Sequence, residues 1–278
     1  MFNKANHIRD RYLEMDMYPS IFCTGCGIGN VLNYSLRALD AEKFDLDKTV
    51  FVSGIGCSSR MPGYLDADGL HTTHGRALAF ATGVKTADPD LNVVIFTGDG
   101  DAAGIGGNHL IHAARRNVDL TVICINNFNY GMTGGQVSPT TPLTSKTSTT
   151  PYGNVELPFD LCDLVIGAGA SYVARWTLGY PYETIKATRE ALRNKGFSFL
   201  EMLVPCPTGF TKHKKVKEGR ETWDWYKDMT ILRREYMKLS KEERAKETRI
   251  VIGKLKDVDK PEFTDQYAQL VARLKADK

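Results

Sequence analysis

Short apolar runs alternate along most of the chain with stretches in which apolar residues recur at helical spacing. Leu32, Leu36 and Leu39, for example, fall on one face of a helix. The apolar runs predict strands at residues 50–53, 93–96, 121–125, 171–174 and 197–204. The helical pattern predicts helices at residues 29–40, 73–87, 108–117, 160–166 and from Pro181 to a stop at Gly196. Alternating strands and helices predict an α/β fold, with a parallel sheet flanked by crossover helices.

Two segments depart from this alternation. Residues 138–151 are crowded with Ser, Thr and Pro, which predicts a long loop. From about residue 212 the chain becomes strongly charged and ends in an amphipathic stretch. We therefore divide the chain into an α/β domain over residues 1–211 and a charged C-terminal arm over residues 212–278. The arm is expected to pack on the domain or on a partner.

Composition and charge add further expectations. The chain has 278 residues, of which 42% are apolar, so it can bury the core of one large domain with an appendage. Its first residues are polar and show neither a secretory signal nor a membrane-spanning run, so we expect a cytoplasmic protein with no membrane partner. The formal net charge of +3 is too small to indicate a nucleic-acid partner. The basic run at 212–217 is either a solvated turn, the commoner case, or a docking surface.

A glycine-rich loop follows the second predicted strand. Gly98, Gly100 and Ala103 fit the G-x-G-x-x-A fingerprint of dinucleotide-binding proteins. Asp119 then lies at the distance expected of the acid that binds the ribose, so a nicotinamide-dependent dehydrogenase is one interpretation. Asp99 opposes it, because a carboxylate at this position would repel a pyrophosphate unless a cation lay between them. The loop therefore predicts a divalent metal ion.

The chain supplies further oxygen ligands for such an ion. Mg²⁺ takes oxygen ligands, usually one or two from protein side chains and the rest from phosphate and water. Asn126 and Asn127 end the next predicted strand, on the same edge of a parallel sheet as Asp99. Gly98-Asp99-Gly100 with the later Asn127 resembles the thiamine diphosphate motif, in which these residue types hold Mg²⁺ on the cofactor's diphosphate. The alternative is a sheet-edge turn that is merely rich in Gly and Asn.

This resemblance implies a set of site residues. The implied Mg²⁺ ligands are Asp99, the side chain of Asn127 and the main-chain carbonyl of Asn129. The residues implied to lie against the diphosphate, or to close over it, are Gly98, Gly100, Asp101, Gly131 and Met132.

Six cysteines in a chain of this kind do not suggest a disulfide framework. Cys124 and Cys162 lie within apolar runs and are expected to be buried core thiols. The other four lie beside Gly or Pro in loop-like stretches, and they are Cys23, Cys26, Cys57 and Cys206.

The Cys23-x-x-Cys26 pair has three interpretations: a thioredoxin-like redox pair, half of a zinc site, or two ligands of an iron–sulfur cluster. No second closely spaced pair follows it. Cys57 and Cys206 each come just after a predicted strand, on the edge of the sheet that carries Asp99. Four thiolates can therefore converge at this edge, as one [4Fe–4S] cluster requires.

Taken together, the motifs indicate a family. The chain contains, in order, CTGCG, GIGCSSR, HTTHGRALAFATGVK, GDGD, NNFNYGMTGGQVSPTTP and PCPTG. This set spans residues 23–209 and resembles the β subunits of 2-oxoacid:ferredoxin oxidoreductases. The resemblance implies a thiamine diphosphate-binding fold, with one [4Fe–4S] cluster on the four loop cysteines. The additional implied contacts to thiamine diphosphate are Ile55, Gly56, Cys57 and Ser58. His74 is implied as a polar contact in the same site, with a capping or core role as the alternative.

The resemblance also implies an activity. Such an enzyme oxidatively decarboxylates a 2-oxoacid, passes the electrons through the cluster to ferredoxin and transfers the acyl group to coenzyme A. No protein nucleophile or acid–base triad is expected, because the cofactor carries the chemistry. The stretches GCSSRMPGY, GLHTTHGRALAFATG and HAARRN resemble 2-oxoglutarate-type members more than pyruvate-type members. Pyruvate or another 2-oxoacid is the alternative substrate, and Arg60-Met61 and the long charged tail depart from common family forms.

Partners follow from the size of the domain and from the resemblance. One α/β domain cannot supply both halves of a thiamine diphosphate site, so we expect an α subunit to provide the pyrimidine-side module and the isolated chain to be inactive. The expected assembly is an αβ unit or its dimer. Candidates to steer an acidic ferredoxin are Lys212, Lys214, Lys215 and Lys217, and the tail could dock further redox subunits. Two rival interpretations are a cluster-free thiamine diphosphate enzyme subunit and a noncatalytic electron-transfer or scaffold subunit.

Overall fold

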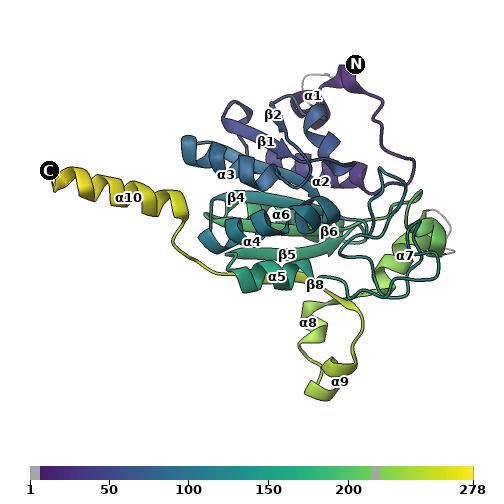
Figure 1. Ribbon diagram of the computed structural model, residues 1–278. Helices are drawn as coiled ribbons and strands as arrows, with labels where there is room; N and C mark the ends of the chain where they lie inside the picture. Colours follow the sequence, from purple (N-terminus) through teal and green to yellow (C-terminus); the bar gives the residue numbers. More distant parts are fainter. Residues whose placement is uncertain (1–6, 215–218, 278) are drawn as a thin grey trace.

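The computed structural model describes residues 7–214 and 219–277 of the chain (Figure 1). Within these residues one mixed sheet has the strand order β2-β1-β3-β4-β6-β5-β8-β7. The strands are β1 (Thr49–Ser53), β2 (Asp68–His71), β3 (Asn92–Gly98), β4 (Leu120–Asn126), β5 (Tyr172–Thr177), β6 (Phe197–Leu203), β7 (Thr230–Leu232) and β8 (Ile250–Asp257).

Helices connect the strands and form the arm. The α-helices are α1 (Ile8–Tyr12), α2 (Ile28–Ala41), α3 (Ala77–Ala87), α4 (Gly107–Arg116), α5 (Leu161–Ala168), α6 (Pro181–Arg193), α7 (Arg220–Asp228), α8 (Arg233–Tyr236), α9 (Lys241–Lys246) and α10 (Phe263–Ala276). The shorter helical turns are η2 (Met15–Met17), η3 (Leu46–Lys48), η4 (Ser58–Tyr64), η5 (Asp101–Ile105) and η6 (Thr211–Lys214). None of the described helices is long and apolar enough to cross a bilayer.

The sequence-based predictions of the α/β fold are confirmed. The five predicted strands correspond to β1, β3, β4, β5 and β6, and the five predicted helices to α2, α3, α4, α5 and α6. Residues 138–151 contain neither helix nor strand, as predicted. The strands from β2 to β5 in the sheet order are all parallel, so their carboxyl ends lie along one edge. Loops that leave this edge carry the candidate site.

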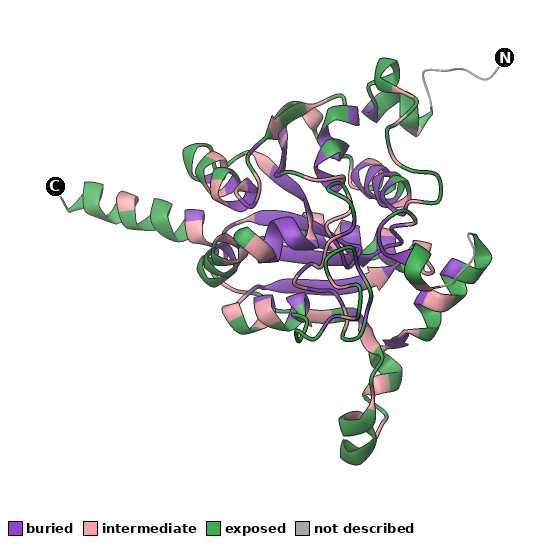
Figure 2. Cartoon of the chain, turned by 45° about the vertical axis from the view of Figure 1, so that its right-hand side comes forward, coloured by how far each residue is buried: buried purple, intermediate pink, exposed green. Residues whose placement is uncertain are grey.

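Helices cover both faces of the sheet, as its nearly continuous apolar strands require. Buried side chains of α2 and α6 share one core with Ile123 and Ile125 of β4. Side chains of α3, α4 and α5 share a second core, on the other face, with Val122 and Cys124. Cys162 of α5 is also fully buried, which confirms the predicted core role of the two apolar-run cysteines. Figure 2 shows the central strands buried between these layers.

The C-terminal arm continues the sheet. β8 pairs antiparallel with β5, so the sheet extends past the change in composition near residue 212. Tyr226 of α7 is buried and donates its hydroxyl to the carbonyl oxygen of Val204 at 2.6 Å. In contrast, α10 extends away from the rest of the chain and is exposed along nearly all of its length (Figures 1 and 2). The arm therefore packs on the domain through α7 and β8, whereas α8 and α9 have no buried residue and project from it (Figure 1).

Candidate functional site

The loops after β3 and β4 enclose a cavity of about 160 Å³ at the carboxyl edge of the sheet. The structure brings nearly all the predicted cofactor and Mg²⁺ residues together around it, namely Ile55, Gly56, Ser58, His74, Gly98, Asp99, Gly100, Asp101, Asn127, Asn129, Gly131 and Met132. Cys57 does not line the cavity and lies one residue before η4. Lining residues that the sequence analysis did not single out are Ile125, Tyr130 and Thr133.

Asp99 is a buried carboxylate at the base of this cavity. One of its oxygens, Oδ2, accepts hydrogen bonds at 2.6 Å from the hydroxyls of both Ser138 and Thr140. The backbone N–H of Asn127 also donates to the carboxylate. Burial nevertheless raises the pKa of Asp99 to about 6, against the opposing effect of these donors. A buried carboxylate whose hydroxyl donors all occupy one oxygen fits a cation on the other oxygen.

The two asparagines of the motif supply further oxygens. Asn127 Oδ1 and Asn129 Oδ1 are both buried and have no hydrogen-bond partner. A buried amide oxygen without a hydrogen-bond partner costs folding free energy unless a ligand or an ion binds to it. The Asn129 amide nitrogen donates to the carbonyl oxygen of Asn127 at 2.7 Å, which ties the two residues together. Asn129 Oδ1 lies against Gly209, whereas Asp99 and the unpartnered Asn127 Oδ1 both line the cavity and fit an oxygen-seeking divalent ion.

The Asp101 side chain lines the cavity and also makes several hydrogen bonds to neighbouring loops. Its Oδ1 accepts from the backbone N–H of Gly75 at 2.8 Å and of Ile55 at 3.2 Å, and His74 Nδ1 lies 2.8 Å from the same atom. Its Oδ2 accepts from the Thr97 hydroxyl at 2.7 Å. Protein donors thus occupy both oxygens, and Asp101 holds the loops after β1 and β2 against the cavity wall.

Gly100 allows the close approach of Tyr130 to the glycine loop. A Cβ at residue 100 would lie 2.1 Å from the Tyr130 ring, whereas a Cβ at Gly107, the first residue of α4, would meet nothing within 4 Å. Gly100→Ala is therefore expected to displace the ring, costing about 1–3 kcal/mol of stability. It should also weaken binding of thiamine diphosphate with Mg²⁺, measured by calorimetric titration. Gly107→Ala is the matched control, and equal affinities of the two variants would contradict this role of Gly100.

The four loop cysteines lie near one another. Cys23 and Cys26 lie in the turn before α2, and Cys57 and Cys206 follow β1 and β6 at the carboxyl edge. Burial raises the pKa of Cys26 to about 11, with further increases from the charges of Cys206, Cys57 and Cys23. Burial and the thiolates of Cys206 and Cys23 also raise the pKa of Cys57. These interactions place the four thiols within electrostatic range of one another.

Small residues bring the cysteine loops together. The Gly27 N–H donates to the carbonyl oxygen of Pro205 at 3.3 Å, which joins the Cys23–Cys26 turn to the Cys206 loop. A Cβ at Gly209 would lie 2.9 Å from Cys206 Sγ. Over residues 7–214 and 219–277, no group of three or more His, Cys, Asp and Glu side chains is arranged to hold a single metal ion.

The position of Asp119 contradicts the interpretation of the glycine loop as a dinucleotide-binding site. This residue precedes β4, at the opposite edge of the sheet from the glycine loop. Its Oδ2 lies 2.7 Å from Lys85 Nζ and 3.3 Å from Lys195 Nζ. Asp119 is therefore an ion-pair partner at the amino edge of the sheet and cannot bind a ribose at the cavity.

The candidate ferredoxin-steering lysines differ from one another. Lys212 is exposed and lines a cavity of about 420 Å³ together with Cys26 and Trp223. Lys214 donates to the Ser145 hydroxyl at 2.8 Å, and its Nζ lies 4.7 Å from the centre of the Phe210 ring. Lys215 and Lys217 lie outside the described residues.

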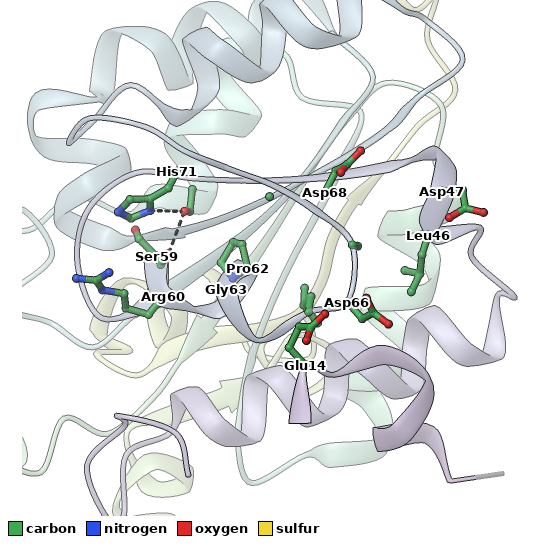
Figure 3. Close-up of a pocket in the computed structure, with 14 residues that line it drawn as sticks. Glu14, Leu46, Asp47, Ser59, Arg60, Pro62, Gly63, Asp66, Asp68 and His71 are labelled. Atoms are coloured by element: carbon green, nitrogen blue, oxygen red, sulfur yellow. Dashed lines mark hydrogen bonds between the residues drawn. The ribbon is translucent and has the colours of Figure 1, made fainter. Parts of the chain in front are cut away.

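A larger cavity, of about 740 Å³, lies on the other side of η4 (Figure 3). At one end, Ser53 Oγ donates to the carbonyl oxygen of Ser59 at 2.9 Å and lies 2.9 Å from His71 Nδ1. Arg60 is near this end, and the opposite end carries acidic side chains, including Asp66. η4 therefore separates the two cavities, with Ser58 on one and Ser59 on the other.

Comparisons with known proteins agree with this geometry. Residues 54–202 match the family described as "Thiamine pyrophosphate enzyme, C-terminal TPP binding domain". This match spans the strands and loops that form the smaller cavity. The fold and site thus define a thiamine diphosphate enzyme subunit that carries the cofactor-binding domain.

Individual relatives indicate which family of thiamine diphosphate enzymes the chain resembles. The chain is 53% identical to the 2-oxoglutarate synthase subunit KorB of Methanothermobacter marburgensis, over 94% of this chain and 91% of that protein. It is 58% identical to the KorB subunit of Archaeoglobus fulgidus, over 74% and 75%. Its fold matches a 2-oxoglutarate:ferredoxin oxidoreductase of Magnetococcus marinus, solved with 2-oxoglutarate, coenzyme A and succinyl-CoA bound, at a TM-score of 0.84 and 33% identity, over 97% and 91% of the two chains. The chain belongs to the KorB family of 2-oxoacid:ferredoxin oxidoreductase β subunits.

Proposed function

We propose that this chain is the β subunit of an enzyme that converts 2-oxoglutarate, coenzyme A and oxidised ferredoxin into succinyl-CoA, CO₂ and reduced ferredoxin. The observation that carries the proposal is the buried Asp99 carboxylate beside two unpartnered amide oxygens at the carboxyl edge of the sheet. The relatives named as 2-oxoglutarate synthase subunits support 2-oxoglutarate over pyruvate or another 2-oxoacid.

In this proposal the smaller cavity receives the diphosphate end of thiamine diphosphate. Asp99, the side chain of Asn127 and the main-chain carbonyl of Asn129 hold Mg²⁺, and Gly98 and Gly100 give the diphosphate close access to the main chain. When bound, the cofactor supplies a carbanion for the 2-oxo carbon and a sink for the electrons left when CO₂ departs. The residues of this chain bind and orient the cofactor, and no protein nucleophile is needed.

Four cysteines hold one [4Fe–4S] cluster in the same proposal, and they are Cys23, Cys26, Cys57 and Cys206. Burial opposes charged thiolates here, as the raised pKa of Cys26 indicates, and iron would supply the compensating positive charge. Cys57 directly precedes Ser58, which lines the cofactor cavity. A cluster on these residues would therefore lie close enough to the cofactor to accept its electrons and pass them to ferredoxin.

An α subunit completes the enzyme in this proposal, as an αβ unit or its dimer. Exposed apolar side chains near the cavity support a covering partner: Ile55 is 41% exposed, Ile105 57% and Met132 44%. All six cysteines are free thiols, which fits a reducing compartment such as the cytoplasm. The exposed α10 is a candidate surface for further redox subunits.

Lys212 is the proposed steering residue for ferredoxin, because it is exposed beside Cys26. Lys212→Glu is expected to slow ferredoxin reduction at low ionic strength and to flatten its dependence on salt. The measurement is the initial rate of ferredoxin reduction across a salt series. Lys48→Glu, an exposed residue directly before β1 at the amino edge of the sheet, changes the net charge equally and serves as the control. An unchanged salt dependence in Lys212→Glu would contradict the steering role.

The deciding experiment is an anaerobic absorption spectrum of the purified αβ complex. Adding 2-oxoglutarate with coenzyme A should bleach the cluster absorption, and pyruvate with coenzyme A should bleach it more slowly. Iron and acid-labile sulfide are measured on the same sample. A complex without iron, or a cluster that no 2-oxoacid reduces, would overturn the proposed function, and so would full activity of this chain alone.

A further inference from the structure

A buried network of charged residues lies behind the cation site and is not explained by cofactor contact. Arg175 of β5 and Glu201 of β6 are both almost fully buried, and Arg175 Nε donates to Glu201 Oε2 at 2.6 Å. Arg175 also pairs with Asp160 through its Nη2 and donates to the carbonyl oxygen of Val251 at 3.2 Å. These contacts fix the position of the Glu201 carboxylate on the central strands.

The other oxygen of Glu201 contacts the end of β4. Glu201 Oε1 accepts a hydrogen bond from Asn126 Nδ2 at 2.7 Å. An ionised carboxylate only accepts hydrogen bonds, so it requires the NH₂ group of the Asn126 amide to face it. The Asn126 carbonyl oxygen must then face the opposite way, towards the turn that carries the cation residues.

That turn depends on the Asn126 oxygen. Asn126 Oδ1 accepts the backbone N–H of Phe128 at 3.0 Å. Phe128 has a φ of 62°, a left-handed conformation that a bulky residue adopts only when its surroundings impose it. The turn presents Asn127 and Asn129, whose amide oxygens are unpartnered. Thr140 lies 3.0 Å from the same Asn126 oxygen and donates to Asp99.

We propose that Glu201 is a positioning residue for the cation site: held by Arg175, it orients Asn126 and thereby fixes the turn that presents Asn127 and Asn129. This inference rests on the proposed function, because it assumes that the cation is bound with thiamine diphosphate. Glu201 does not line the cavity, and its hydrogen bond to the turn runs through Asn126.

The test is Glu201→Gln in the assembled αβ complex. Arg175 Nε and Asn126 Nδ2 donate to different oxygens of Glu201, so a glutamine would turn its NH₂ group towards one of these donors and lose that hydrogen bond. We expect the affinity for Mn²⁺, titrated by electron paramagnetic resonance in the presence of thiamine diphosphate, to fall roughly 10–100-fold, as on loss of an outer-shell partner of a metal site. At saturating Mg²⁺ and cofactor, kcat should largely recover, because the reacting groups are unchanged.

Two further variants separate positioning from general stability. Cys162→Ala removes the Sγ donor that lies 3.2 Å from Glu201 Oε2 but keeps the contact with Asn126, so it should lower the Tm without changing Mn²⁺ affinity. Asn126→Ala keeps the Arg175–Glu201 pair and should weaken Mn²⁺ binding as Glu201→Gln does, which decides the question if the glutamine variant fails to assemble. Unchanged Mn²⁺ affinity in either Glu201→Gln or Asn126→Ala would overturn the inference. Absence of Mn²⁺ binding by the wild-type complex would instead contradict the proposed function.

Discussion

Asp99→Asn is expected to reduce the rate at which the assembled enzyme oxidises its 2-oxoacid by at least two orders of magnitude. This loss is larger than the roughly 10–100-fold loss of metal affinity or activity that follows removal of an outer-shell partner of a metal site. The amide keeps the shape of the side chain and an oxygen for Ser138 and Thr140, but it removes the negative charge that faces the cation. The measurement is the steady-state rate of ferredoxin reduction with 2-oxoglutarate, beside a titration of Mg²⁺ with thiamine diphosphate. Activity near the wild-type level would show that Asp99 is not a ligand.

The same variant should stabilise the metal-free chain. Burial raises the pKa of Asp99 from its ordinary 3.8 to about 6, so the folded state binds this proton more tightly than the unfolded state does. Protonation of Asp99 therefore contributes fully to the free energy of unfolding below about pH 4. This contribution decreases as the pH rises towards 6 and is lost above that pH, and the total loss is roughly 3 kcal/mol. Urea unfolding of metal-free wild type should show this decrease, and Asp99→Asn should not.

Cys206→Ser is expected to abolish the cluster and, with it, ferredoxin reduction. Cys206 is buried, and its thiolate, like that of Cys23, raises the pKa of both Cys26 and Cys57, so it lies near these two thiols. A serine hydroxyl is a poor substitute for a thiolate on iron. Iron and acid-labile sulfide should fall to background, while thiamine diphosphate still binds in the separate cavity lined by Asp99.

Cys124→Ser provides the matched control for this experiment. Cys124 is a fully buried core thiol of β4, away from the loop cysteines in the fold. Its variant should keep the iron content and lose only stability. If Cys206→Ser retained a full complement of iron and sulfide, the four-cysteine assignment would be wrong.

Much of the fold could be predicted because parallel strands buried on both faces leave uninterrupted apolar runs in the sequence. The gathering of Asp99 and Asn127 followed from the same rule, since the ends of such strands meet at one edge. These two predictions needed only local pattern and one topological principle. The other predicted cavity residues came from the family resemblance, and Ile125, Tyr130 and Thr133 were not predicted.

Hydrogen-bond and ion-pair partners that lie far apart in the sequence could not be predicted in this way. Ser138 and Thr140 were predicted only as part of a loop, and nothing local indicates that their hydroxyls reach Asp99. Glu201 does interrupt an apolar run, a signal that a buried charge needs a partner, but its partner Arg175 lies on another strand. Pairing of β8 with β5 also depends on contacts between distant segments.

The order of the strands has a consequence for how this subunit associates. Along the described chain, the sheet terminates in β2 on one side and β7 on the other, which are four and three residues long. Such brief outer strands offer few free backbone groups, so another polypeptide gains little by adding to the sheet. Oligomers of this protein should therefore form through side-chain surfaces, and a subunit stored without its partners should resist fibrous self-association.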